Sequence, residues 1–89
     1  MTKYVTIDCT PMTGPEEVHD LFARALDFPA YYGRNLDALY DLLSTCPPTV
    51  LTLNNTAAFQ AMFRYGDNLR LALEDAARDN PNLTLILND

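Results

Sequence analysis

Three short β-prone runs, widely spaced along the chain, limit what this sequence can fold into. They lie at residues 4–7, 49–53 and 83–87, and helical patterns and turn residues fill the segments between them. Strands joined by helical crossovers pair in parallel with right-handed connections. The order βααβααβ therefore predicts an α/β fold: one three-stranded parallel sheet packed with about four helices, in a single domain over residues 1–89. The last run is mostly apolar at consecutive positions, which is typical of a strand covered on both faces.

Helical spacing is clearest in the segment that follows the first run. Apolar residues recur there at i, i+3, i+4, i+7 and i+8, namely Val18, Leu21, Phe22, Ala25 and Leu26. Thr13 and Glu16 have the spacing of a capping box and mark the expected start of this helix. Pro29 disfavours a helical backbone at Phe28, so the stretch of about residues 27–34 is expected to be a loop.

A second helix is expected after Asn35, because asparagine favours the N-cap position. One face of this helix is apolar and carries Leu36, Leu39 and Leu43. At about 100° per residue, Asp37 and Asp41 lie about 40° apart on a flank away from the leucines, with Tyr40 and Ser44 alongside. The pattern predicts a helix surface that is both acidic and aromatic, ending before Pro47 and Pro48.

The remaining segment, between the second and third β-prone runs, predicts two more helices. A short one would be capped by Asn55 or Thr56. A longer one is expected after Gly66, ending before Asn80 and Pro81, with an inward face made of Leu69, Ala72, Leu73 and Ala76. About ten large apolar side chains would then be buried, enough for a core without a metal or a disulfide.

The charge balance restricts the class of partner. Twelve acidic residues against six basic ones give a formal net charge of −6. Binding a phosphate backbone depends on clusters of Lys and Arg, whereas an acidic surface repels polyanions and speeds the approach of basic proteins. The composition therefore argues against nucleic acid and favours a basic protein, although acidity alone also keeps small proteins soluble.

Two cysteines and a polar N-terminal segment bear on the compartment. Cys9 and Cys46 lie in no closely spaced metal-ligand motif and are expected to be buried free thiols. The first eight residues alternate polar and apolar side chains, unlike a signal peptide or a membrane span. The expectation is a cytoplasmic protein with no membrane association.

One continuous run of the sequence resembles a known family. It comprises Tyr31, Tyr32, Gly33, Arg34, Asn35, Leu36, Asp37, Ala38, Leu39, Tyr40, Asp41, Leu42 and Leu43. The run is similar to the barstar family's pattern of two aromatics, a glycine, one variable residue, Asn-Leu-Asp-Ala-Leu, an aromatic and an aspartate. Length and element order also agree with that family along the whole chain. The resemblance implies a monomeric intracellular inhibitor that blocks, in a 1:1 complex, a secreted guanyl-specific ribonuclease made by its own cell.

The resemblance also implies roles for individual residues. Asp41 matches the aspartate that enters the nuclease's phosphate site and pairs with its arginines and catalytic histidine, in place of the substrate phosphate. Asp37 matches a second acidic contact, and Tyr31 matches an aromatic that packs against that histidine. Gly33 and Asn35 match positions that shape the binding loop. The full set of expected partner contacts is Tyr31, Gly33, Arg34, Asn35, Asp37, Ala38, Tyr40, Asp41, Ser44 and Asp75.

Three of these positions depart from the family pattern or match it weakly. Arg34 stands where an acidic residue is known, which inverts one local charge. Tyr40 replaces a common tryptophan and keeps stacking area while gaining a hydroxyl group. Asp75 is aligned by counting back from the last strand across Pro81, so a shift of one residue is allowed. The identity of the partner depends on these differences.

Other interpretations of the same residues remain open. Asp37 and Asp41 taken alone would be a solvated helix face, or the carboxylate pair of a small hydrolase or transferase. No further ligands are signalled for a metal, and no catalytic residue or cofactor is expected. His19, the sole histidine, lies among polar positions and is expected at the surface, while Tyr32 is either a core residue or a contact. An immunity protein for a different basic toxin, or a binding domain without a nuclease partner, is the alternative function.

Overall fold

The computed structural model describes residues 1–89 and contains one sheet and four helices. In chain order the elements are β1 (Lys3–Asp8), α1 (Pro15–Leu26), α2 (Leu36–Ser44), β2 (Thr49–Asn54), α3 (Ala58–Ala61), α4 (Arg64–Asp79) and β3 (Leu83–Leu87). The strands lie in the order β1-β2-β3, and both neighbouring pairs are parallel. The predicted βααβααβ order and three-stranded parallel sheet are confirmed.

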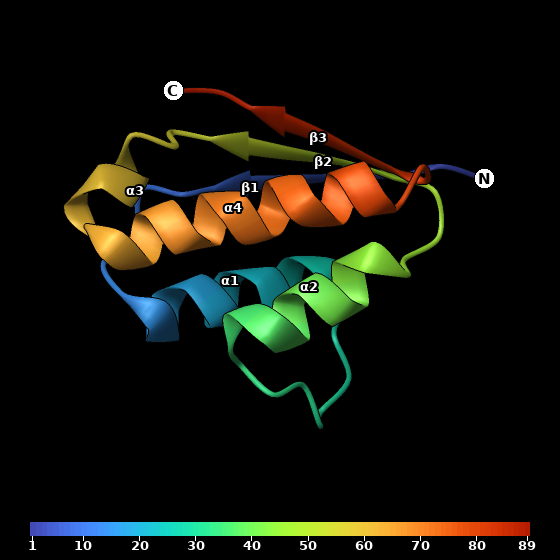
Figure 1. Cartoon of the computed structure of the whole chain (residues 1–89), viewed down its shortest axis with the longest axis horizontal. Coiled ribbons are helices and arrows are strands. Elements are labelled where there is room, and N and C mark those ends of the chain that lie inside the picture. The colour runs from blue at the N-terminus through green and yellow to red at the C-terminus, as the bar shows by residue number, and fades with distance from the viewer.

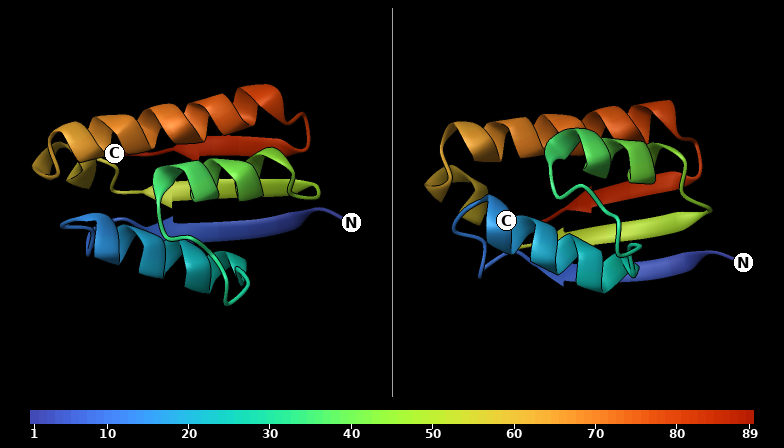
Figure 2. Two further views of the ribbon diagram at one scale, coloured as in Figure 1. Left: turned by 60° about the horizontal axis from the view of Figure 1, so that its bottom comes forward. Right: turned by 90° about the horizontal axis from the view of Figure 1, so that it is seen from below.

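The helices all cover the same face of the sheet, so the molecule has two layers (Figures 1 and 2). Both crossovers step in the same direction along the sheet, and right-handed connections of that kind place their helices on one side. The opposite face is open: Tyr4 on β1 is 77% exposed and Ile86 on β3 is 40% exposed. The expectation that β3 is covered on both faces is therefore wrong, because strand order, which the apolar run does not encode, decides coverage.

The core lies between the sheet and the helices. Strand residues that point toward the helices, such as Leu51 and Leu53, are fully buried against the predicted helix stripes. The helix residues with the least exposure are Val18, Phe22, Leu39, Leu43, Leu69, Leu73 and Ala76. Those stripes are confirmed, and they fix which faces of α1, α2 and α4 stay at the surface.

The predicted helix ends are right for α2 and wrong for α1 and α3. The Asn35 side chain caps α2 by accepting a hydrogen bond from the Ala38 backbone N–H at 2.7 Å. At α1 the N-cap is Gly14, and the Thr13 hydroxyl bonds to Glu17 instead of closing a capping box with Glu16. At α3 the N-cap is Ala57, with no side-chain cap. Local spacing identifies which residues can cap a helix, but not where the backbone turns.

The junction between α3 and α4 is tighter than the sequence suggests. Helix α4 begins at Arg64, so Gly66 lies inside the helix, whereas the sequence predicted a start after Gly66. A Cβ atom built on Gly66 would lie 1.9 Å from the Phe59 carbonyl oxygen, so only glycine allows this close approach of the two helices. Phe63 between them has a positive φ of 54° and is exposed. The glycine therefore belongs to the packing within α4 and does not precede the helix.

A buried side chain at the end of α4 holds the end of α2. The Asn80 amide donates to the carbonyl oxygens of Leu43 at 2.9 Å and Cys46 at 3.1 Å. Carbonyls at a helix C-terminus have no partner within the helix, so this amide satisfies them. The C-terminal end of α2 is thereby tied to α4.

Both thiols are free, as predicted, although only Cys9 is fully buried while Cys46 is half-buried. Burial raises the pKa of the Cys9 thiol to about 11, with a smaller contribution from Asp8. The Cys9 thiol is therefore protonated at neutral pH. None of the four helices combines the length and the apolar character that a membrane span requires.

Candidate protein-binding site

Helix α2 presents two unpaired carboxylates to solvent. Asp37 and Asp41 are both exposed, and neither side chain makes a hydrogen bond or an ion pair within the chain. Their positions follow from the amphipathic pattern, because Leu39 and Leu43 occupy the opposite, buried face of the helix. Two negative charges are therefore available to an external partner without breaking an internal contact.

A hollow of about 200 Å³ lies between this helix and the preceding loop, here called the binding loop (residues 27–35). It is lined by Tyr31, Tyr32, Gly33, Ala38, Asp41 and Leu42. The Tyr31 ring is 85% exposed beside it. A Cβ atom on Gly33 would lie 3.2 Å from the Ala38 side chain, so the loop runs close against α2. The hollow therefore brings aromatic and apolar side chains together with one carboxylate.

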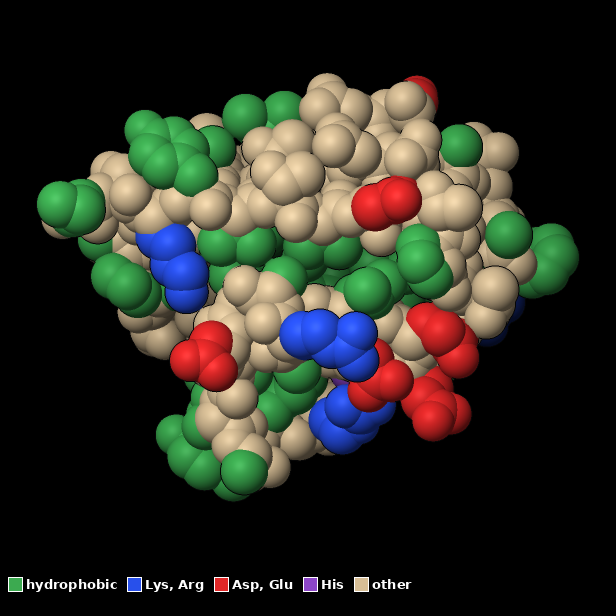
Figure 3. All heavy atoms as spheres, turned by 180° about the vertical axis from the view of Figure 1, so that it is seen from behind, with side chains coloured by type: hydrophobic (Ala, Val, Ile, Leu, Met, Phe, Trp, Pro, Cys, Tyr) green, Lys and Arg blue, Asp and Glu red, His purple; other side chains and the backbone are tan.

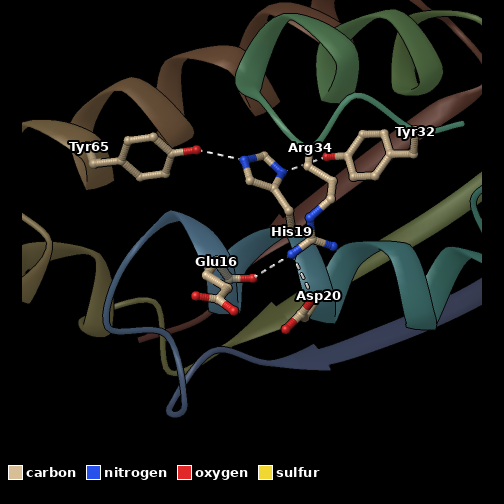
Figure 4. Close-up of polar contacts among 6 residues, drawn as sticks. All are labelled: Glu16, His19, Asp20, Tyr32, Arg34 and Tyr65. Carbon is tan, nitrogen blue, oxygen red and sulfur yellow. Dashed lines mark hydrogen bonds and ion pairs between the residues drawn. The ribbon is translucent and has the colours of Figure 1, made fainter.

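Tyr32, one of the residues that line the hollow, belongs to a buried polar chain, which is drawn in Figure 4. The Tyr32 hydroxyl and Nδ1 of His19 are 2.6 Å apart, and Nε2 of His19 is 2.6 Å from the Tyr65 hydroxyl. His19 is only 1% exposed, and Tyr32 is buried as well. The expectation of a surface histidine is wrong, since its neighbours in sequence are polar but its side chain points between two tyrosines from distant elements.

Burial sets the protonation state along this chain. Desolvation lowers the pKa of His19, and the positive charge of Arg34 lowers it further, while Asp20 opposes both. Desolvation also raises the pKa values of Tyr32 and Tyr65. A neutral imidazole between two neutral hydroxyl groups is the result at neutral pH.

Arg34 points away from the hollow and toward α1. Its guanidinium donates to the Asp20 carboxylate at 2.7 Å and to the Glu16 carbonyl oxygen at 3.3 Å (Figure 4). The Arg34 backbone has a positive φ of 55°, which is uncommon for a residue other than glycine. The inverted charge noted in the sequence is thus compensated inside the chain by Asp20.

On the other side of α2, its aromatic residue is joined to α4. The Tyr40 hydroxyl donates to the Asp79 carboxylate, and Arg78 forms ion pairs with Asp79 at 3.1 Å and with Asp75 at 3.0 Å. The Tyr40 hydrogen bond, followed by that from Arg78, lowers the pKa of Asp79. Asp75 is half-buried and already paired, unlike Asp37 and Asp41.

Of the predicted contacts, Asp37 is exposed on α2 without an internal partner, and the others fall into four groups. Tyr31, Gly33, Ala38 and Asp41 surround the hollow. Asn35 and Ser44 bond to the backbone around α2, with the Ser44 hydroxyl donating to the Asp41 carbonyl oxygen. Arg34 lies over α1, while Tyr40 and Asp75 lie toward α4.

Four residues outside the predicted set shape the hollow. Tyr32 and Leu42 line it, and both belong to the same sequence motif as most of the predicted contacts. His19 and Tyr65 support it from below, although Tyr65 lies 46 residues from His19 in the sequence. No local spacing could have joined them.

The molecule has a second hollow, which neither the binding loop nor α2 lines. This hollow of about 240 Å³ lies between β1 and α1, and its lining includes Ile7, Leu21 and Arg24. Figure 3, which views the molecule from behind, shows apolar surface across the middle, with acidic and basic side chains mixed below it. No three His, Cys, Asp or Glu side chains gather in a metal-binding arrangement.

Two comparisons with known proteins agree. The family model described as Barstar (barnase inhibitor) matches residues 2–87, which include the binding loop, α2 and α4. The chain is also 33% identical over 80 residues to a Bacillus subtilis (strain 168) protein named "Putative ribonuclease inhibitor YrdF". That alignment covers 86% of this chain and 88% of the relative.

Proposed function

The chain belongs to the barstar family, and from this premise we propose that it inhibits a guanyl-specific, barnase-like ribonuclease by occluding the active site of that enzyme. The observation that carries the proposal is Asp41, an exposed carboxylate without an internal partner at the rim of the hollow beside Tyr31. No cofactor takes part. The inhibitor acts inside the cell that makes the nuclease, as one molecule bound to one enzyme.

Asp41 is suited to replace a substrate phosphate. A carboxylate offers two coplanar oxygens that an arginine guanidinium grips with two parallel hydrogen bonds. When the complex excludes water, such charge-assisted bonds strengthen, and Asp41 breaks no internal bond in making them. The nuclease's phosphate-binding arginines and catalytic histidine are the proposed partners.

The surrounding residues supply shape and secondary charge. The Tyr31 ring, with the apolar side chains of the hollow, packs against the catalytic histidine of the enzyme. Asp37, on the same flank of α2, contacts a basic group near the guanine-binding side. Gly33, Asn35 and Ala38 keep the loop close to α2, while Tyr40, Ser44 and Asp75 border the contact and Arg34 stays on α1.

The direct test is a ribonuclease assay with barnase as the probe. Guanyl-specific cleavage is measured with and without an equimolar amount of the protein, at two salt concentrations. The variant Asp41→Ala removes the central carboxylate. Its matched control is Glu74→Ala, which removes the same charge from the exposed surface of α4, outside the proposed contact set.

Stoichiometric inhibition that Asp41→Ala relieves and Glu74→Ala retains is the expected result. Inhibition that is indifferent to Asp41 would contradict the proposed mechanism while leaving an inhibitor. Absence of inhibition, combined with capture of a basic toxin of another activity, would favour the immunity-protein alternative. Turnover of a substrate without any partner would indicate an enzyme.

A further inference from the structure

We propose that His19 is a positioning residue for ribonuclease binding, because it fixes Tyr32 and thereby holds the binding loop in its contact-ready form. This inference rests on the proposed function for its effect on binding. Its structural part, the control of the loop by His19, can be tested without any partner.

The His19 ring is the point where three segments meet. It belongs to α1, its Nδ1 bonds to Tyr32 of the binding loop and its Nε2 bonds to Tyr65 of α4, each at 2.6 Å (Figure 4). Tyr32 also lines the hollow, together with Tyr31 and Asp41. The same tyrosine therefore lines the proposed binding surface and is hydrogen-bonded to the buried His19.

Few other contacts hold the loop at this point. The Tyr32 backbone N–H bonds to the Pro29 carbonyl oxygen within the loop itself, and the Tyr32 ring packs on Phe28 at 4.7 Å between centroids. The Arg34 ion pair reaches α1, but both of its side chains are about half exposed. Exposed pairs of this kind contribute little, and the Arg34 bond to the Glu16 carbonyl oxygen is long and exposed as well, so the bond to His19 is the buried side-chain hydrogen bond between the loop and α1.

Hydrogen-bond counting shows why a neutral histidine suits this place. A neutral imidazole has one N–H donor and one acceptor nitrogen, so one tyrosine hydroxyl accepts from the ring and the other donates to it. No buried side-chain polar atom in the structure lacks a partner. Protonation would turn both nitrogens into donors, and the hydroxyl that donates to the ring would lose its acceptor.

The charged groups near His19 act in opposite directions. Arg34 from the loop disfavours a charged ring, and Asp20 from α1 favours it, while α4 contributes only the neutral Tyr65 hydroxyl. Because Arg34 and Asp20 are paired with each other at 2.7 Å, their effects on the ring oppose each other. Desolvation, the largest cause, keeps the ring neutral and the chain complete at neutral pH.

The partner-free test measures opening of the loop in the free protein. Chymotrypsin cleaves after aromatic residues, and Tyr31 is exposed, so cleavage there reports how often the loop leaves its position. Tyr32→Phe keeps the ring that lines the hollow and removes only the hydroxyl that bonds to His19. Cleavage after Tyr31 should become roughly tenfold faster, the factor expected for losing one buried hydrogen bond.

Three further variants separate positioning from general stability. Ile7→Val trims the core beneath the sheet, away from the loop, and urea is added until its global stability matches that of Tyr32→Phe. His19→Gln retains one donor and one acceptor and should restore part of the protection that His19→Leu loses. If Tyr32→Phe and His19→Leu are cleaved after Tyr31 no faster than Ile7→Val, the positioning role is overturned.

Acidification gives an independent signature. As the pH falls from 7.5 to 5.5, the parent should lose loop protection and approach Tyr32→Phe, in which the loop is already free of His19. Rates are divided by those of a reference peptide at each pH, because the protease itself titrates. A ratio of parent to variant that stays constant would contradict the role of the neutral ring.

Binding is then measured with barnase. Dissociation should be roughly tenfold faster for Tyr32→Phe and unchanged for Ile7→Val, with most of the effect in the dissociation rate. A loop that opens without any change in dissociation would overturn the proposal. If the parent does not bind barnase at all, the proposed function fails, and loop cleavage alone still decides whether His19 holds the loop.

Discussion

The binding loop and α4 lie on opposite sides of α2, and different interactions hold the side chains of each in place. On the loop side the connection is a buried, neutral chain through His19, with an exposed ion pair from Arg34 beside it. On the α4 side the exposed contacts are charged, through Arg78, Asp75 and Asp79. The two sides of α2 are thus bordered by different kinds of interaction.

Because of this difference, salt concentration and pH should affect the interactions on the two sides of α2 differently. Surface ion pairs are screened by salt, whereas a buried neutral hydrogen bond is hardly affected. A buried histidine responds to pH near neutrality, whereas carboxylates paired with arginine respond only in acid. Varying salt and pH separately should therefore resolve the two sides of the site.

The largest expected effect lies between the two sides, at Asp41. Asp41→Asn keeps the size of the side chain and removes its charge, leaving the partner's arginines buried without a counterion. The dissociation constant for barnase should rise by roughly 30- to 5,000-fold, the range for breaking a buried charge pair, at both low and high salt. Titration calorimetry measures it, and a change below threefold would place Asp41 outside the contact.

The next effect concerns the loop side and pH. The folded protein holds the pKa of His19 below 6.5, so its neutral form is the one that folding favours. This contribution is complete above about pH 6.5, and stability is lost as the pH falls from there through the lower folded pKa. Between pH 7.5 and pH 5.0, the urea unfolding midpoint should fall more for the parent than for His19→Gln. An equal fall in the two proteins would show that His19 is not the source of the pH dependence.

A smaller effect is expected from α4 and salt. Arg78→Ala frees Asp75 and Asp79 and takes the formal net charge from −6 to −7. Association with barnase should become about two- to threefold faster at low salt and converge with the parent at high salt, because long-range attraction is screened. Stopped-flow mixing tests this, with Asp75→Ala changing the rate in the opposite direction.

The smallest effect is expected at Tyr40. Tyr40→Phe removes the hydroxyl that donates to Asp79, which is the leading cause of the lowered pKa of that carboxyl. Nuclear magnetic resonance should show the Asp79 pKa moving up toward 3.8, while affinity for barnase changes less than about threefold. A large loss of affinity would mean that the hydroxyl contacts the partner directly.

The order and type of the main elements could be predicted from the sequence because each depends on local periodicity. The leucines of α2 and the apolar run of β3 specify a helix and a strand over a few residues, and Asn35 caps α2 through a residue three positions away. The open sheet face could not be read in this way. It depends on which strand lies beside which, a property of the whole chain.

In the site, too, the features that are local in sequence could be predicted and the contacts between distant residues could not. The hollow combines the loop with the first part of α2, which are adjacent in sequence, so one motif contained all of its lining residues. His19 was assigned to the surface because its neighbours in sequence are polar, but a tyrosine 46 residues away covers it. Arg34 was recognised as an unusual charge, whereas its partner Asp20 could be found only in three dimensions.

The open face of the sheet has a practical consequence. Every helix lies on the other side of the sheet (Figure 2). Thr6 alternates with the buried Val5 and Ile7 and Thr84 follows the buried Leu83, so both face away from the helices, and both are exposed. A cysteine introduced at either position could carry a dye or couple the protein to a resin while α2 remains free. The open face of the sheet is thus a place to attach the protein to a support while the surface that would capture a nuclease points away from it.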